Sequence, residues 1–455
     1  MDASKLSTTS CRHVAFIPHP GRGHVNPMLN LCKLIASRRP DLHVSFILTE
    51  EWLALLGSQA KPINFATIPN VLPSELVRGS DLLGFLESVQ TEMTEPVERL
   101  LNQLEPPPDL IIADCFLSWA VELGKRRKIP VASFWPASPS SFTAFYHHQL
   151  ILSRHFYPLD LSGSSGEERI DFIPGIPSIR LADLPGEFQV NNKRGLNIVT
   201  TIVSTASKAQ CIIFRTIKEL EESALTSLRA SISIPLYPVG PAIPNSTNSP
   251  NRTPDYIEWL DTQQERSVLY ISLGSFLSAT SAQVDELAAG LKDSAVPFLW
   301  VARSQTDELS PAVVGDKGMV VSWCDQMRVL RHASVGGFLT HCGWNSALET
   351  AFAGVAALTF PLGIDQTVNS KVIVEDWGIG WRMKNEFRDL VRRERVSEAL
   401  KRFMDLESSE RMELDSKCAK LNELLQLAVA EDGSTSSLDE FFSDFLPIQD
   451  PSGAF

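Results

Sequence analysis

Two ionisable side chains follow the ends of two short apolar runs in the first quarter of the chain. His24 lies in the stretch IPHPGRGHVNPM, just after the run HVAFI at 13–17, and Asp114 directly follows the run DLIIA at 109–113. A carboxylate bonded to one imidazole nitrogen fixes the tautomer, so that the other nitrogen can accept a proton. The two residues can therefore form a general-base pair. A surface histidine and a helix N-cap are the alternative interpretations of His24 and Asp114.

The residues around His24 predict a turn from a strand into a helix. Gly21 and Gly23 permit a sharp turn, Asn26 suits a helix N-cap and Pro27 suits the first helical position. The third glycine of a dinucleotide-binding fingerprint is missing. We therefore expect a crossover that carries His24 rather than a dinucleotide site.

A second set of polar and aromatic residues lies between 323 and 366. The run at 335–340 leads into HCGWNS and a helical pattern. A helix N-terminus presents free N–H groups and the positive end of the helix dipole, which suits a phosphate group. The side chains or turn residues that could contribute there are His341, Gly343, Asn345 and Ser346. Further candidates are Trp323 for stacking on a base, and Glu349, Asp365 and Gln366 for binding sugar hydroxyls.

Composition limits the class of protein. The chain has 455 residues, which suits two domains, and a net charge of −13 at pH 7. This charge argues against a nucleic acid or an anionic membrane as partner. The 7 cysteines show no C-x-x-C spacing, so we interpret them as reduced thiols. No signal-peptide pattern and no apolar run of about 18 residues occurs, so we expect a cytoplasmic protein without membrane insertion.

Short β-rich runs alternate with helical patterns in both halves, which indicates parallel sheets covered on both faces. The expected strands are 13–17, 43–48, 63–67, 109–113, 130–135 and 210–214, then 267–272, 297–302, 318–322, 335–340 and 355–360. A proline-rich stretch separates the two series. We therefore expect an N-terminal domain over 1–240, a linker over 241–254 and a C-terminal domain over 255–455. The last helical patterns lie at 394–430 and 436–446, and we expect the last helix to pack back on the N-terminal domain.

The segment from Trp323 to Gln366 closely resembles the signature box of plant family-1 glycosyltransferases, which transfer sugar from a uridine diphosphate sugar to small molecules. HCGWNS, Glu349 and the closing DQ carry this resemblance. It extends to PHPGRGHVNP, IIAD and LYISLGS, and so covers nearly the whole chain. The resemblance implies an α/β chain with the GT-B fold, in which two Rossmann-like, doubly wound parallel-sheet domains face each other across a cleft. The N-terminal domain would bind the acceptor and the C-terminal domain the donor.

The resemblance also implies roles for individual residues. His24 would be the general base and Asp114 its orienting partner. Trp323 would stack on uracil, Cys324 would offer backbone contacts, and Gln326 and Glu349 would hold the ribose. Ser275, His341, Asn345 and Ser346 would bind the diphosphate, while Trp344, Asp365 and Gln366 would contact the sugar. No metal and no cofactor are implied, because UDP-glucose is a co-substrate.

Some positions differ from the common pattern of the family. Pro136 lies where many members carry a threonine that reaches the sugar, and Ser138 is a possible substitute. Ala356 replaces a common proline, PLGIDQ lacks an aromatic residue before Asp365, and WCDQ differs from the commoner WAPQ. The first three differences concern the sugar side of the pocket, where we expect glucose, whereas WCDQ keeps Trp323 and Gln326.

The acceptor pocket is expected to have an apolar wall, although each of its candidates could equally be ordinary core. The candidates are Phe85, Phe116, Trp119, Phe142, Phe145 and Phe188. An apolar wall favours phenols, terpenoid alcohols or aromatic acids.

The expected function is an inverting O-glycosyltransferase that moves glucose from UDP-glucose to a hydroxyl or carboxyl of a small plant metabolite, acting as a monomer. The alternative is a non-catalytic sensor of a UDP-sugar or small molecule, which would need neither His24 nor Asp114. An NAD-dependent oxidoreductase or epimerase is disfavoured because the chain lacks a complete G-x-G-x-x-G and a Tyr-x-x-x-Lys pair. A metal hydrolase is disfavoured because His341 and Cys342 have no third ligand nearby in the sequence.

Overall fold

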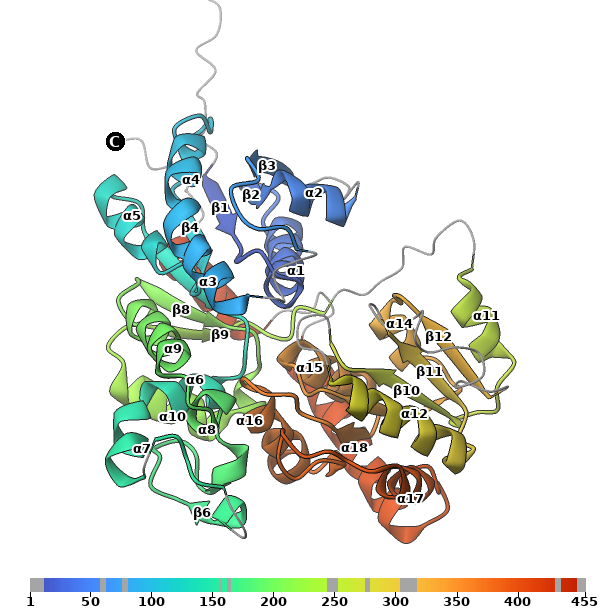
Figure 1. Ribbon diagram of the computed structural model, residues 1–455. Coiled ribbons are helices and arrows are strands. Elements are labelled where there is room, and N and C mark those ends of the chain that lie inside the picture. The colour runs from blue at the N-terminus through green and yellow to red at the C-terminus, as the bar shows by residue number, and fades with distance from the viewer. Residues whose placement is uncertain are drawn as a thin grey trace, which may run out of the picture.

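The computed structural model describes residues 12–57, 63–75, 81–155, 157–161, 165–243, 253–274, 279–302, 317–429 and 435–447. Two α/β lobes, each built around a parallel sheet, make up this part of the chain (Figure 1). The predicted phosphate ligand Ser275 and residues 244–252 of the predicted linker lie outside the described residues.

The N-terminal sheet has seven parallel strands in the order β3-β2-β1-β4-β5-β8-β9. In that order the strands are β3 (Asn64–Ile68), β2 (His43–Thr49), β1 (His13–Ile17), β4 (Leu110–Asp114), β5 (Val131–Trp135), β8 (Cys211–Phe214) and β9 (Leu236–Pro238). The chain order reverses between β1 and β4. In open α/β sheets, ligands bind beside this reversal, beyond the carboxyl ends of the strands.

The C-terminal sheet has six parallel strands in the order β12-β11-β10-β13-β14-β15. In that order the strands are β12 (Gly318–Val321), β11 (Phe298–Val301), β10 (Val268–Ser272), β13 (Val335–Thr340), β14 (Ala357–Thr359) and β15 (Gly380–Arg382). Its reversal lies between β10 and β13, so each lobe has one predicted ligand-binding edge.

Helices cover both faces of the sheets. The helices of the N-terminal lobe are α1 (Arg22–Arg38), α2 (Glu50–Leu56), α3 (Leu82–Glu92), α4 (Thr94–Leu101), α5 (Trp119–Arg127), α6 (Pro139–Tyr146), α7 (His148–Arg154), α8 (Gly186–Gln189), α9 (Lys193–Ala206) and α10 (Glu222–Ser231). Those that follow are α11 (Asp255–Asp261), α12 (Ser281–Ser294), α14 (Gln326–Leu330), α15 (Trp344–Ala353), α16 (Gln366–Lys371), α17 (Arg393–Phe403), α18 (Ser409–Ala428) and α19 (Ser436–Phe445). The short 3-10 turns are η2 (Ser165–Glu167), η3 (Leu181–Asp183) and η4 (Lys218–Leu220), and η5 (Val372–Asp376) is a π-helix that continues α16.

The strand β1 shows why this sequence gives a sheet buried on both faces. All of its residues are buried. Val14 and Phe16 point into a core that includes α1, whereas Ala15 and Ile17 point into a core that includes α3 and α4. Because side chains alternate across a strand, the apolar run from Val14 to Ile17 requires cover on both sides.

The C-terminal helix α19 crosses back to the N-terminal lobe. Phe441 packs against Tyr237 of β9 with ring centroids 5.5 Å apart, and Arg38 of α1 forms an ion pair with Asp439 at 2.7 Å. Leu438 and Phe441 belong to the same apolar core as β1. Helix α19 therefore packs on the N-terminal lobe, as predicted.

A cluster of ion pairs also joins the two lobes. Arg180 of the two-stranded antiparallel hairpin β6 (Arg169–Ile170) and β7 (Ile179–Arg180) pairs with Asp183 at 2.8 Å. Asp183 also accepts from Arg382 of the C-terminal sheet at 2.8 Å, and Arg382 reaches Glu375 at 2.9 Å. These bonds, together with an apolar core that runs through both lobes, hold the lobes against each other.

The predicted α/β architecture is confirmed, and the differences lie at the edges of the sheets. The short strands β9 and β15 and the hairpin β6–β7 were not predicted. The expected strand at 355–360 is only β14 (Ala357–Thr359), and the pattern at 394–430 divides into α17 and α18. The side chain of Ser408 accepts the backbone N–H of Arg411 and starts the second of these helices.

Candidate active site

His24 and Asp114 are brought together at the reversal point of the N-terminal sheet. Nδ1 of His24 lies 2.8 Å from Oδ2 of Asp114, and Oδ1 accepts the backbone N–H of Phe116 at 3.0 Å. The Asp114 side chain is fully buried and that of His24 is 22% exposed. Because a carboxylate can only accept, Nδ1 carries the proton and Nε2 of the neutral ring is left as a base. The N-cap interpretation of Asp114 is wrong, because Asp114 ends β4 and α5 is preceded by Ser118.

The turn that carries His24 differs from the prediction. Helix α1 begins at Arg22 with Gly21 as N-cap, so Asn26 is not the cap and Pro27 lies inside the helix. Proline has no N–H, so the carbonyl of Gly23, four residues earlier, lacks its usual helical donor. Nδ2 of Asn345, from the other lobe, donates to this carbonyl at 3.2 Å.

The expected phosphate site lies where β13 leads into α15. Gly343 is the N-cap of α15 and offers no side-chain cap, so the first N–H groups of the helix are left for an anion. Nδ1 of His341 lies 3.3 Å from the carbonyl oxygen of Ser272 and must donate to it. Burial lowers the pKa of His341 to about 4, although this hydrogen bond opposes the shift. The ring is therefore neutral near pH 7 until a negative charge binds beside Nε2.

The residues expected to hold the nucleoside form a connected group beside α15. The side chain of Trp323 is 57% exposed, so its ring is available for stacking. Nε2 of Gln326 donates to Oε2 of Glu349 at 2.7 Å and to Oγ of Ser346 at 3.0 Å. Burial raises the pKa of Glu349, and the charge of Arg215 opposes that rise. The backbone stretch of Cys324 is held in place by a 3.3 Å contact between its sulfur and the hydroxyl of Tyr270.

The residues expected to hold the sugar lie across from His24. Burial raises the pKa of Asp365. Two effects oppose this rise in pKa: Nδ2 of Asn369 donates to Oδ2 at 2.8 Å, and His24 carries a positive charge when it is protonated. Oε1 of Gln366 accepts the backbone N–H of Leu362 at 2.8 Å. The imidazole of His24, the N-terminus of α15 and the buried carboxylate of Asp365 thus lie close together between the lobes. This arrangement can deprotonate a nucleophile next to a phosphorylated donor.

Two side chains that were expected from the sequence to contact the sugar make other hydrogen bonds instead. The hydroxyl of Ser138 is buried, accepts the backbone N–H of Ser141 as the cap of α6, and donates to Oδ1 of Asn369 at 2.8 Å. It therefore does not replace the threonine missing at Pro136. The indole of Trp344 is also buried and donates to the carbonyl of Arg215 at 2.9 Å, so this side chain is not available to a sugar.

Only some of the aromatic side chains predicted to line the acceptor pocket lie near His24. Phe116 packs edge-on against His24 with ring centroids 4.8 Å apart, and Phe85 packs edge-on against His19, which neighbours His24. The indole of Trp119 donates to the carbonyl of Val89 at 3.1 Å. The other three, Phe142, Phe145 and Phe188, are fully buried members of the large apolar core.

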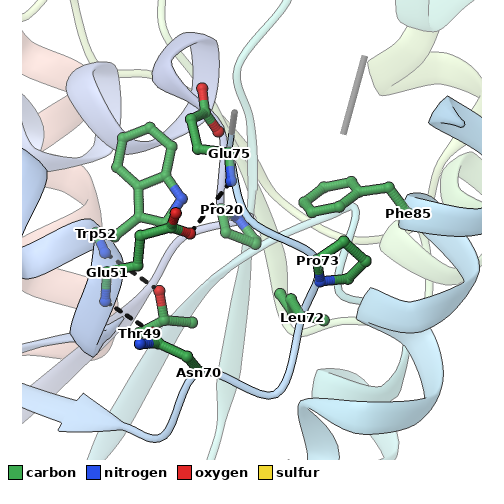
Figure 2. A pocket seen from close by; sticks show the side chains of 9 residues that line it. All are labelled: Pro20, Thr49, Glu51, Trp52, Asn70, Leu72, Pro73, Glu75 and Phe85. Carbon is green, nitrogen blue, oxygen red and sulfur yellow. Dashed lines mark hydrogen bonds between the residues drawn. The ribbon is translucent and has the colours of Figure 1, made fainter. Parts of the chain in front are cut away.

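A small pocket is lined on one side by Phe85. Figure 2 shows it between Trp52 and Phe85, with Pro20 of the His24 turn among its lining residues. Its volume of about 10 Å³ holds about one water molecule. This pocket is therefore too small for an acceptor, for which several hundred Å³ are usual.

Sequence reasoning missed Arg215, the residue that follows β8. Its side chain is only 1% exposed. Nε donates to the carbonyl of Pro241 at 2.5 Å, and Nη1 donates to Oδ1 of Asn345. Its position in the sequence could have identified it. Arg215 follows the apolar run CIIF, as Asp114 follows the run DLIIA, and both strands end at the same edge of the same sheet.

Sequence reasoning also missed Glu187 in α8. Its Oε2 is buried without a hydrogen-bond partner among the described residues. Burial raises the pKa of Glu187 to about 7, and the nearby charge of Asp365 adds to the shift. Helix α8 lies directly against the sugar side of the site, since the N–H of Gly186 donates to the carbonyl of Ile364 at 2.9 Å.

Glu187 predicts a pH-dependent stability. Its folded-state pKa lies above the ordinary value of 4.5, so the stability it contributes is complete below about pH 4.5 and is lost as pH rises through about 7. Glu187→Gln cannot ionise. We compare the free energy of unfolding of Glu187→Gln with that of wild type. The difference in favour of the variant should be larger at about pH 8.5 than at about pH 5, by on the order of 3 kcal/mol. Urea unfolding at both pH values measures this, with the exposed Glu265→Gln as control. An equal difference at both pH values would contradict it.

Neither a metal centre nor a membrane span is found within the ranges that the structure describes. No group of three or more His, Cys, Asp or Glu side chains there could hold a metal ion. No helix in these ranges is long and apolar enough to cross a bilayer.

Comparisons with known proteins agree with this geometry. Residues 235–416 match the family model described as UDP-glucoronosyl and UDP-glucosyl transferase. UDP-glycosyltransferase 87A2 of Arabidopsis thaliana is 46% identical over 97% of this chain and 98% of its own length. 7-Deoxyloganetin glucosyltransferase of Catharanthus roseus is 30% identical over 93% of this chain and 94% of its own length. The crystal structure of Medicago truncatula UGT71G1 complexed with UDP-glucose is similar with a TM-score of 0.80 and 26% identity, covering 95% of this chain and 98% of that one. The two facing lobes thus have the GT-B fold, and the chain belongs to the plant family-1 UDP-glycosyltransferases.

Proposed function

We propose that the protein is an inverting O-glycosyltransferase that transfers glucose from UDP-glucose to a hydroxyl or carboxyl group of a small apolar plant metabolite. The observation that carries the proposal is the 2.8 Å bond between Nδ1 of His24 and Asp114, which leaves Nε2 as a base beside Asp365. Glucose as the sugar is supported by the pair Asp365 and Gln366 and by the name of the Catharanthus relative.

In the proposed reaction, Nε2 of His24 removes the proton of the acceptor hydroxyl while the acceptor oxygen bonds to the anomeric carbon of glucose. The bond from that carbon to the diphosphate breaks on the opposite face, and UDP leaves with the electron pair. An α-linked donor therefore gives a β-glucoside. Asp114 stabilises the imidazolium that forms.

The leaving charge is proposed to be met by the N-terminus of α15, by Asn345 and Ser346, and by His341, without a metal ion. Ser275 completes the set in the proposal, although it lies outside the described residues. The described cysteines are free and buried, which fits a reducing compartment, and we propose that the enzyme acts in the cytoplasm as a monomer.

The test is transfer from UDP-glucose, UDP-galactose and UDP-glucuronic acid to a panel of phenols, terpenoid alcohols and aromatic acids. UDP release, product mass and the anomeric coupling in NMR spectra are measured. We expect β-glucosides or glucose esters, with UDP-glucose as the preferred donor. An α-linked product would contradict inversion, and preference for another donor would contradict glucose. Tight binding of UDP-glucose without transfer to any acceptor would favour the sensor.

A further inference from the structure

Arg215 occupies an unusual place for a charged side chain. It belongs to the N-terminal lobe, yet it contacts both of the first two residues of α15 in the C-terminal lobe. Its carbonyl accepts from the indole of Trp344 at 2.9 Å, and its Nη1 donates to Oδ1 of Asn345. Arg215 therefore contacts the N-terminus of the proposed diphosphate-binding helix through both its side chain and its backbone.

The guanidinium of Arg215 is buried without an ion pair among the described residues. Its two hydrogen-bond acceptors, the Pro241 carbonyl and the Asn345 amide, are both neutral. Burial lowers the pKa of Arg215 to about 10, and Glu349 is the carboxylate whose charge opposes this shift. A buried charge is costly unless an opposite charge is nearby. The diphosphate of a sugar nucleotide at the start of α15 would supply that charge.

The contacts of Asn345 fix which way its amide faces. A guanidinium can only donate, so Oδ1 must face Arg215. Nδ2 then faces the carbonyl of Gly23, which can only accept and to which it donates at 3.2 Å. This carbonyl is available because Pro27 cannot supply the helical N–H. Gly23 directly precedes His24, so the chain of contacts runs from Arg215 through Asn345 to the turn that carries the proposed base.

We propose that Arg215 is a positioning residue that orients Asn345, places a positive charge beside the donor diphosphate and ties the donor-binding helix to the His24 turn. This inference rests on the proposed UDP-sugar site and adds to it a residue that the signature box does not contain. It implies that binding of the diphosphate, rather than of the nucleoside, depends on Arg215.

The experiment compares the affinities of the full chain for UDP and for uridine by calorimetry, in wild type, Arg215→Met and Arg215→Lys. We expect Arg215→Met to weaken UDP binding about tenfold or more while uridine binding stays within about twofold. Arg215→Lys should recover part of the loss, because it keeps the charge but lacks the planar fork. Equal losses for UDP and uridine, or no loss for UDP, would overturn the inference.

Arg411→Met is the matched control. Arg411 is also fully buried, but it donates to the carbonyl of Gly336, near the opposite end of β13, and pairs with Asp415. We expect this variant to lower thermal stability without changing the ratio of UDP to uridine affinity. A ratio that falls as much as in Arg215→Met would overturn the specific role of Arg215.

Pro27→Ala tests the link to the base without altering Arg215, and serves if Arg215→Met does not fold. The alanine at position 27 has a backbone N–H, which would compete with Asn345 for the Gly23 carbonyl. The substitution also removes a proline from within helix α1. We expect a higher melting temperature together with a kcat lower by about threefold or more. An unchanged kcat would overturn the link. Absence of UDP binding by the wild type would overturn the proposed function and this inference together, whereas wild-type binding with unaffected variants would overturn the inference alone.

Discussion

His24→Ala is expected to lower kcat for transfer to alcohol and phenol acceptors by about 10²–10⁴-fold, the usual contribution of a positioned general base. The bond between Nδ1 and Asp114 leaves Nε2 as the nitrogen that takes the proton. Steady-state kinetics with UDP-glucose and one acceptor at saturation measures the loss. UDP affinity should stay close to that of wild type, because the proposed diphosphate site lies on the other lobe.

Three comparisons make this result specific. Asp114→Asn can donate to Nδ1 and so favours the tautomer that carries its proton on Nε2, and we expect it to lose activity as well. A carboxylic acid acceptor that is already ionised needs no base, so His24→Ala should lose much less with it. His332→Ala is the control, because His332 precedes β13 at the opposite edge of the C-terminal sheet and bonds Asp261. Activity of His24→Ala with alcohols within about threefold of wild type would rule out the base.

The central strands of both sheets could be predicted because they are buried on both faces. The run HVAFI is apolar or small at nearly every position, and β1 occupies the predicted residues, as does β13. The strands of these two sheets that were missed, β9 and β15, have three residues each and lie at sheet edges. Such short strands show no periodicity, and their position is decided by the neighbouring strand rather than by their own sequence.

The candidate site could be predicted where an ionisable residue directly follows, or lies close after, the end of a predicted strand. His24 and Asp114 follow adjacent strands at the reversal of the sheet, so their meeting follows from topology. Arg215 was missed because a lone arginine after a strand usually faces solvent, and its burial depends on α15 from the other lobe. The aromatic wall could not be told from core, since Phe142 and Phe116 differ in surroundings and not in residue type.

Gly343→Ala is expected to weaken binding of UDP about tenfold or more through a single added methyl group. The backbone at Gly343 has φ −59° and ψ 142°, which alanine adopts without strain. Its Cβ, however, would lie 2.5 Å from Nε2 of His341. The ring cannot easily retreat, because a Cβ built on Gly274 would itself be only 2.7 Å from the same atom, so the two backbones enclose the ring closely.

Displacing this ring removes a charge-assisted donor. The Ser272 carbonyl holds the proton of the neutral ring on Nδ1, so Nε2 donates to phosphate only when the diphosphate stabilises the imidazolium. Uridine lacks the diphosphate, and its affinity should therefore be unchanged in Gly343→Ala. The double variant with His341→Ala separates the clash from other effects. If the clash is the cause, Gly343→Ala adds little once the ring is gone, whereas an equal loss in both backgrounds would place the defect in the helix terminus itself.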